Sequence, residues 1–199
     1  MANIERDQIS EDILKSIVFG LTGKNASGKG TVAEILKKKN FTYHSLSDSL
    51  RDELKSLKKE ETRENLIDIG NELREKGGPG VLADKLIPKL NFENNHIVDS
   101  IRNPLEVISL RKETLLRRFF LISVDANSRL RYDRLCSRGR TGDTDSWEKF
   151  VEQEKKEENN DDPNKQQLSR TMQMADYIID NSGTLEELEA QVNKIISSL

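Results

Sequence analysis

The stretch IVFGLTGKNASGKGT, residues 17–31, joins a short apolar run to a loop rich in glycine. Gly23, Gly28 and Lys29 have the spacing Gly-x-x-x-x-Gly-Lys that is typical of phosphate-binding loops. In such a loop, closely spaced glycines let backbone N–H groups turn toward an anion, and the following helix N-terminus adds partial positive charge. The stretch therefore predicts a strand, a phosphate-binding loop and a helix in succession.

Beyond this loop, short apolar runs alternate with longer segments of helical period. The runs that we interpret as strands are 17–22, 41–46, 96–100, 119–126 and 177–182. Helices are predicted at 31–40, 49–60, 64–76, 81–90, 104–113, 127–138, 146–157 and 184–199. The glycine- and proline-rich residues 76–80 must separate two of these helices. This alternation is typical of an α/β domain whose mainly parallel sheet is covered on both faces.

Composition bounds the class of protein. The 199 residues suit one main domain, and 34% hydrophobic and 34% charged residues with a net charge of −3 give no reason to expect a nucleic-acid partner. The single cysteine, Cys136, cannot form an internal disulfide, which favours a cytoplasmic location. No apolar run approaches the roughly 20 residues that cross a bilayer, so no membrane partner is expected. We expect small-molecule substrates, and a monomer or a homodimer.

The loop itself suggests a nucleotide and a metal. Lys29 is expected to neutralise the β and γ phosphates of ATP. Gly30 stands where the common motif has a serine or threonine that binds Mg²⁺, so Thr31 becomes the hydroxyl candidate. Asp99 ends a predicted strand at the sheet edge where ligands gather, although an aspartate there can also simply cap the next turn. The residues expected around ATP are Gly23, Asn25, Ala26, Ser27, Gly28, Lys29, Gly30 and Thr31.

The loop ending in Gly-Lys-Gly-Thr resembles the phosphate loop of adenylate kinase and related nucleoside monophosphate kinases. Other stretches are similar to that family in the same order: SLSDSLRDEL resembles the start of the acceptor-binding helix, IVDSIRNP the end of the third strand, and RLCSR the start of the lid. ADYIIDNSG resembles the last strand of the group, which includes dephospho-coenzyme A kinases. Residues 62–86 are similar to the acceptor lobe of viral-type deoxynucleoside monophosphate kinases.

The resemblance implies site residues. Asp48 and Arg51 match the acceptor helix, Asp99 and Arg102 match the third strand, and the paired arginines of the lid give Arg134 and Arg138. Guanidinium groups suit these places because they bind phosphate oxygens in a fork and stay charged. We therefore expect acceptor binding by Asp48, Arg51 and Arg102, and metal binding by Thr31 and Asp99. Catalytic roles are expected for Lys29, Asp99, Arg102, Arg134 and Arg138, with Arg140 as a further donor-side cation.

The fold that the resemblance implies is a three-layer α/β P-loop NTPase domain with a five-stranded parallel sheet. Residues 1–16 form an N-terminal extension of the single domain. An inserted acceptor lobe is expected over 47–90, and a lid over 138–166 that closes to exclude water. Hinges are expected at 137–142 and near 161–164, and Trp147 and Phe150, one helical turn apart, are expected to pack the lid helix.

Three functions fit these residues. The first is ATP- and Mg²⁺-dependent phosphoryl transfer to a nucleoside or deoxynucleoside monophosphate, where the enzyme mainly has to screen two anions from each other. The second changes the acceptor to a hydroxyl, as in enzymes similar to dephospho-coenzyme A kinase, and then Asp48 or Asp99 has to serve as a base. The third is an ATP-binding switch without turnover, which the missing hydroxyl at Gly30 favours.

Overall fold

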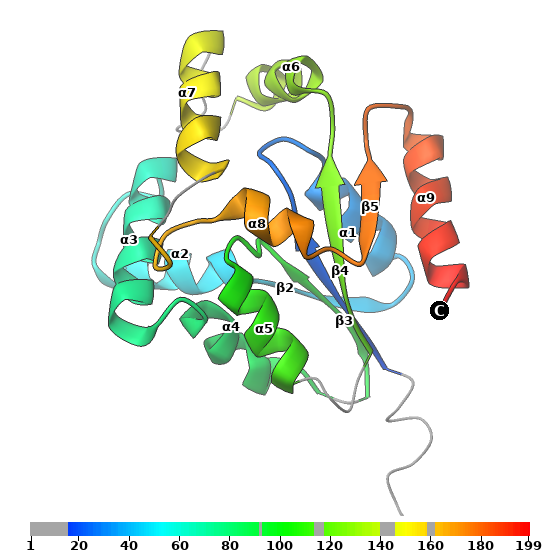
Figure 1. Cartoon of the computed structure of the whole chain (residues 1–199), viewed down its shortest axis with the longest axis horizontal. Helices are drawn as coiled ribbons and strands as arrows, with labels where there is room; N and C mark the ends of the chain where they lie inside the picture. The colour runs from blue at the N-terminus through cyan, green and yellow to red at the C-terminus, as the bar shows by residue number, and fades with distance from the viewer. Residues whose placement is uncertain (1–15, 92, 114–117, 140–145, 159–161) are drawn as a thin grey trace, which may run out of the picture.

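The computed structural model describes residues 16–91, 93–113, 118–139, 146–158 and 162–199. Within these residues one five-stranded sheet forms, with all strands parallel and in the order β2-β3-β1-β4-β5 (Figure 1). The strands are β1 Ile17–Thr22, β2 Phe41–Ser45, β3 Asn95–Asp99, β4 Arg118–Asp125 and β5 Tyr177–Asp180. The predicted strands are thereby confirmed: the first matches at both ends, and no end of the others is off by more than two residues.

Helices connect successive strands and follow the last one. They are α1 Lys29–Lys37, α2 Leu46–Ser56, α3 Arg63–Gly77, α4 Val81–Leu86, α5 Pro104–Glu113, α6 Ser128–Arg138, α7 Trp147–Glu158, α8 Leu168–Gln173 and α9 Leu185–Ser197, with a 3₁₀ turn at Ile87–Lys89. The break between α3 and α4 falls at the predicted glycine-rich residues 76–80. Within the described residues, no helix is both long and apolar enough to cross a membrane.

The sheet has a buried core on each face, which gives the three layers. On one face, Val18 and Leu121 pack with leucines of α2, α4 and α5. On the other face, Phe19 and Ile122 pack with α1 and α9. Because neighbouring residues of a strand point to opposite faces, the continuous apolar runs in the sequence supply both cores. The predicted α/β class and helix cover are confirmed.

Several element ends differ from the prediction for identifiable reasons. Helix α2 begins at Leu46 rather than at residue 49, because Ser45 is extended and its hydroxyl caps the helix by accepting the N–H of Ser47. The predicted helix 81–90 ends as α4 at Leu86 and tightens into a 3₁₀ turn that contains Pro88. The short helix α8 was not predicted, since the charged residues before it were interpreted as loop.

The two predicted insertions occupy the same side of the molecule. Residues 47–90 carry α2, α3 and α4, and α7 lies within 138–166, standing beyond the end of the sheet near α6 (Figure 1). Tyr132 of α6 contacts Trp147 and Phe150 of α7, with ring centroids 5.3 and 5.6 Å away. The predicted packing of these two aromatic side chains is thereby confirmed. Residues 1–15 lie outside the described residues, as does half of the expected first hinge, residues 140–142, with Arg140.

Candidate active site

Two glycines fix the shape of the phosphate loop. Gly23 has φ 142°, and a Cβ on it would stand 2.0 Å from the carbonyl oxygen of Val124. Gly28, which caps α1, has φ 97°, and a Cβ there would stand 2.0 Å from Nδ2 of Asn181. Both positions combine a left-handed backbone with close approach of another chain segment, so only glycine fits. The glycines of the Gly-x-x-x-x-Gly-Lys spacing are therefore required for steric reasons.

Lys29 and Ser27 complete the loop. The Lys29 ammonium, in the first turn of α1, donates to the carbonyl oxygens of Gly23 (2.7 Å) and Lys24 (2.9 Å). Asn181, after β5, donates to the carbonyl oxygen of Ser27 at 2.9 Å and so ties the loop to the end of the sheet. The buried hydroxyl of Ser27 has no hydrogen-bond partner within the described part of the chain. The loop is thus held closed by side chains at both of its ends.

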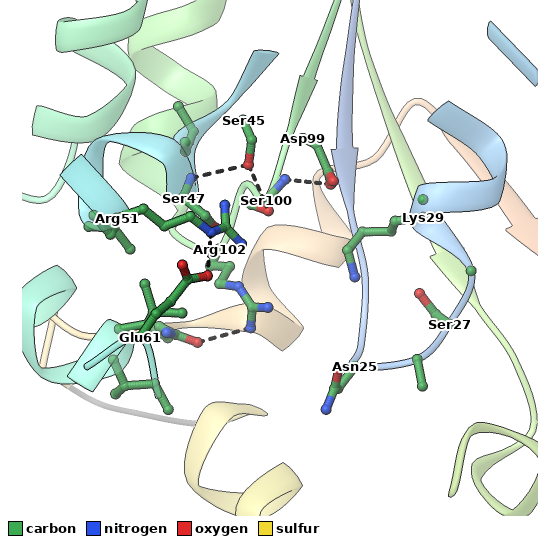
Figure 2. Close-up of a pocket in the computed structure, with 18 of the residues that line it drawn as sticks. Asn25, Ser27, Lys29, Ser45, Ser47, Arg51, Glu61, Asp99, Ser100 and Arg102 are labelled. Atoms are coloured by element: carbon green, nitrogen blue, oxygen red, sulfur yellow. Dashed lines mark hydrogen bonds and ion pairs between the residues drawn. The ribbon is translucent and has the colours of Figure 1, made fainter. Parts of the chain in front are cut away.

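The ends of β2 and β3 place polar groups beside the loop. Ser45 and Asp99 are paired in register, and the Ser45 hydroxyl donates to that of Ser100 at 3.3 Å (Figure 2). Ser100 has φ 68°, a left-handed conformation uncommon for a residue with a Cβ, and such strain concentrates at functional sites. The carboxyl ends of parallel strands meet at one edge, so residues 55 positions apart become neighbours here.

Asp99 is a buried carboxylate with defined partners. One of its oxygens accepts the Tyr43 hydroxyl at 3.0 Å, and the other accepts the N–H of Ser100 at 2.6 Å. Burial, together with the nearby charge of Asp99, raises the pKa of Tyr43, so the phenol stays a hydrogen-bond donor. Asp99 also lines the pocket described below. The oxygen that accepts the N–H of Ser100 still has a lone pair that can accept or coordinate a further group.

The oxygen donors fit a weakly held Mg²⁺ rather than a closed metal centre. Thr31 and Asp99 line the same pocket, and no cluster of three or more histidine, cysteine or acidic side chains suited to a metal occurs among the described residues. Mg²⁺ is usually bound through one or two protein oxygens together with phosphates and water, which matches this donor set. A Cβ at Gly30 would meet nothing within 4 Å, so no steric reason excludes a hydroxyl residue there.

A pocket of about 960 Å³ joins these groups. The phosphate loop forms one end, with Lys29, Asn25 and Ser27 on one side of the close-up and Arg51, Arg102 and Glu61 facing them (Figure 2). Its size is at the upper end of small-molecule sites, which suits two substrates side by side. The predicted residues that line it are Asn25, Ala26, Ser27, Gly28, Lys29, Gly30, Thr31, Arg51, Asp99, Arg102, Arg134 and Arg138.

Two predicted residues lie behind the pocket wall. Gly23 is not a lining residue, but its carbonyl receives Lys29. Asp48 accepts Nη1 of Arg51 at 2.9 Å, and Glu61 accepts Nε of Arg51 at 2.7 Å. Burial acts to lower the pKa of Arg51, but the hydrogen bonds and charges of Glu61 and Asp48 outweigh it and raise the pKa. Asp48 therefore orients Arg51.

Arg102, Arg134 and Arg138 enter the pocket from two further segments. Arg102, after β3, donates through Nη1 to the side chain of Gln166 at 3.2 Å. On α6, Arg134 donates to the carbonyl oxygen of Asn181 at 2.9 Å, and Arg138 donates to the side-chain oxygen of Asn25 in the loop at 3.0 Å. The four predicted arginines that line the pocket thus come from α2, the β3–α5 loop and α6.

Two buried arginines were not predicted. Arg74 of α3 is 2% exposed, lines the pocket and pairs with the fully buried Glu106 at 2.8 Å. Arg131 of α6 is equally buried; it donates to the carbonyl oxygen of Ala126 at 2.8 Å and pairs with Glu154 of α7. The sequence holds a weak indication of their burial, because each arginine lies among the apolar positions of its helix. Arginine is usually exposed, however, so a surface position is the ordinary expectation.

Comparisons with known proteins agree with this geometry. A model of the AAA domain matches residues 20–160. A UPF0200 protein of Pyrococcus furiosus is 33% identical over 187 residues, covering 92% of this chain and 97% of that protein. A UPF0200 protein of Thermococcus kodakarensis is 30% identical and covers 90% and 96% of the two chains.

Among solved structures, a shikimate kinase from Bacteroides thetaiotaomicron superposes with a TM-score of 0.58 at 13% identity, covering 92% of this chain and 99% of that chain. A gluconokinase from Sinorhizobium meliloti superposes with a TM-score of 0.51 at 13% identity, covering 94% and 95%. At such identities the likeness establishes the fold alone, which is the kinase-like P-loop fold. With this fold and these relatives, the chain belongs to the UPF0200 proteins and carries the AAA domain of P-loop proteins.

Proposed function

We propose that this protein is an ATP- and Mg²⁺-dependent kinase that transfers the γ-phosphoryl group to a nucleoside or deoxynucleoside monophosphate, giving the diphosphate. The observation that carries the proposal is a single pocket with the phosphate loop at one end and Arg51 and Arg102 facing it. Two sets of cations around one cavity suit two phosphorylated substrates. A nucleotide switch has no need of the second set.

On the donor side, Lys29 exchanges its two loop carbonyls for the β and γ phosphate oxygens. Arg134 and Arg138 lie on α6 beside the loop, and both line the pocket. Phosphoryl transfer through a loose transition state depends on positioning and on charge cancellation, and three cations in a partly buried site supply both. Bidentate guanidinium contacts also fix the line of transfer.

On the acceptor side, Arg51 and Arg102 grip the monophosphate. Asp48 and Glu61 hold Arg51 in place from behind, at 2.9 and 2.7 Å, so its position is set before substrate arrives. Residues 47–90 then act as the acceptor lobe and 138–166 as the lid, with Gln166 joining the lid to Arg102. Closing such a lid excludes water and suppresses wasteful ATP hydrolysis.

Thr31 and Asp99 are the residues that would hold Mg²⁺. Bound there, the ion would supply charge neutralisation between donor and acceptor phosphates. Asp99 is preorganised for this by Tyr43, whose hydroxyl fixes one carboxylate oxygen at 3.0 Å.

A second candidate function is transfer to a hydroxyl acceptor. The specific observation in its favour is Asp99 itself, a buried carboxylate in the wall between the loop and the acceptor arginines. Such a group can accept the proton of an attacking hydroxyl. Shikimate kinase and gluconokinase, which superpose on this fold, are named for substrates that carry hydroxyl groups.

The first experiment incubates the protein with Mg²⁺-ATP and a panel of ribo- and deoxyribonucleoside monophosphates, dephospho-coenzyme A, shikimate and gluconate, following ADP release and product mass. Conversion of monophosphates to diphosphates supports the proposal. Lys29→Ala is then expected to lower turnover by at least about 10²-fold. Lys37→Ala, an exposed lysine of the same helix, is the matched control and should be fully active.

The same panel separates the alternatives. Phosphorylation of a hydroxyl acceptor, with a loss of about 10²-fold or more in Asp99→Asn, replaces the proposal with the second candidate. ATP binding without turnover on any acceptor, or full activity of a folded Lys29→Ala variant, contradicts both.

A further inference from the structure

Arg74 is an almost completely buried cation of the pocket, and like the partly buried Arg134 it has one nitrogen without a partner among the described residues. Its Nε and Nη2 both donate to one oxygen of Glu106, at 3.2 and 2.8 Å. Its Nη1 is buried and has no hydrogen-bond partner within the part of the chain that the structure describes. A buried N–H group without an acceptor destabilises a fold by about 1–3 kcal/mol, so such groups are rare unless a ligand completes them.

The surroundings of Arg74 decide what kind of ligand suits it. Leu50, Leu66, Ile67 and Leu82 also line the pocket, and all but Ile67 pack in one apolar cluster, so the wall that α2, α3 and α4 form is apolar. The charge of Arg74 is already balanced by Glu106, which is 0% exposed. A second anion placed here would lie close to the buried carboxylate, which is unfavourable at low dielectric. The free donor therefore suits an uncharged acceptor atom on a flat, largely apolar group.

We propose that Arg74 reads the base of the acceptor nucleotide by donating a hydrogen bond from Nη1 to a ring carbonyl oxygen. The acceptor is then a monophosphate of cytosine, uracil, thymine or guanine rather than adenine, which has no carbonyl. This inference rests on the proposed function, in which Arg51 and Arg102 hold the phosphate and the base enters between α2, α3 and α4. A polar group that goes unpaired with the wrong base is a strong source of discrimination.

Gly70, one turn before Arg74 on α3, leaves the space that the contact needs. A Cβ at this position would stand 3.2 Å from Nη1 of Arg74 and 3.5 Å from a methyl carbon of Leu50. Glycine is otherwise unfavourable inside a helix by about 1 kcal/mol relative to alanine. A methyl group on residue 70 would therefore press on Nη1 of Arg74 and contact Leu50, which would crowd the donor that the base has to reach.

The test compares kcat/KM of the wild-type protein and of Arg74→Lys for AMP, GMP, CMP, UMP and their deoxy forms. Lysine keeps a charge beside Glu106 but removes Nη1. We expect the wild-type protein to prefer carbonyl-bearing bases, and Arg74→Lys to lose about 10- to 100-fold on the preferred acceptor and less than about 3-fold on AMP. Arg111→Lys, which alters a half-exposed arginine paired with Asp176, should leave the preference unchanged.

Two further measurements do not depend on the folding of the Arg74 variant. Replacing a ring carbonyl by a thiocarbonyl in the acceptor should lower kcat/KM of the wild-type protein at one ring position. Gly70→Ala should keep the protein folded, because alanine favours a helix more than glycine does. The ratio of kcat/KM between carbonyl-bearing bases and adenine should become smaller in this variant. A preference for AMP, an equal loss on all bases, or no effect of the thio analogues overturns the role of Arg74. A wild-type protein that phosphorylates no monophosphate overturns the proposed function as well.

Discussion

Glu106 holds both Arg74 and the loop that carries Arg102, and replacing it by glutamine tests how much the fold depends on this side chain. One of its oxygens accepts Nε and Nη2 of Arg74, and the other accepts the backbone N–H groups of Arg102 (2.8 Å) and Asn103 (3.1 Å). In Glu106→Gln, one oxygen becomes an NH₂ group. Whichever way the amide turns, two hydrogen bonds are lost and the charge opposite Arg74 disappears.

The size of the effect follows from burial. Both side chains of the pair are almost completely buried, at 2% and 0% exposed. Removing one partner of a buried ion pair lowers the free energy of unfolding by about 3–5 kcal/mol, because the remaining charge is left uncompensated. For a domain of this size, that corresponds to a fall in Tm of roughly 6–20 °C. An exposed ion pair has no comparable effect.

Urea denaturation and thermal unfolding of Glu106→Gln measure this loss. Glu72→Gln, which breaks an exposed ion pair with Lys76 on α3, is the matched control. It should leave the urea and thermal unfolding midpoints unchanged. Combining Glu106→Gln with Arg74→Met should destabilise the fold less than the sum of the two single changes, because no unpaired charge remains. A loss below about 1 kcal/mol in Glu106→Gln, or strict additivity in the double variant, would refute the reasoning.

Three further predictions concern other parts of the fold. Gly28→Ala is expected to weaken binding of a fluorescent ATP analogue by more than about tenfold, because its methyl group collides with Asn181 and the φ of 97° is strained; unchanged affinity contradicts this. Phe150→Ala should lower the free energy of unfolding in urea by about 3–5 kcal/mol if α7 unfolds with the domain, since the ring is 1% exposed; a separate early transition would show that it does not. Burial, with the nearby charges of His96 and Lys89, holds the pKa of His44 below its ordinary 6.5. The folded state thus resists protonation of His44, so the free energy of unfolding falls as pH falls below 6.5. In urea titrations at pH 5–7, the free energy of unfolding of His44→Gln should depend less on pH than that of the wild-type protein.

The sequence predicted those parts of the fold in which a local pattern of residues is compatible with only one structure. The five strands follow from apolar runs that a parallel sheet buries on both faces. The phosphate loop follows from Gly23 and Gly28, where the structure leaves no room for a side chain. Lys29 was predicted from the same motif, and Arg102 from the resemblance. Asp99 was predicted because it ends a strand, and in a parallel sheet all carboxyl ends share one edge.

What could not be predicted depends on contacts between distant segments. Arg74 and Glu106 are 32 positions apart, and nothing in the period of either helix shows that the two charges meet in the core. The same holds for Arg131 and Glu154, 23 positions apart, whose pairing joins α6 to α7. Charged residues are usually exposed, so a sequence pattern assigns them to the surface unless their partners are known. The arginines of the pocket were therefore predicted only in part, because Arg74 was missed.

The three residues after Ser100 connect the parts of the pocket. The backbone N–H groups of Arg102 and Asn103 rest on Glu106, whose other oxygen holds Arg74. The side chain of Asn103 donates to the carbonyl oxygens of Pro163 and Lys165, where the chain returns from α7. One fully buried carboxylate thus holds Arg74 and the backbone of Arg102 at once, and the next residue ties the same loop to residues 163–165. Because packed interiors leave little room for a local shift, Glu106→Gln is expected to disturb the Arg102 loop as well as Arg74.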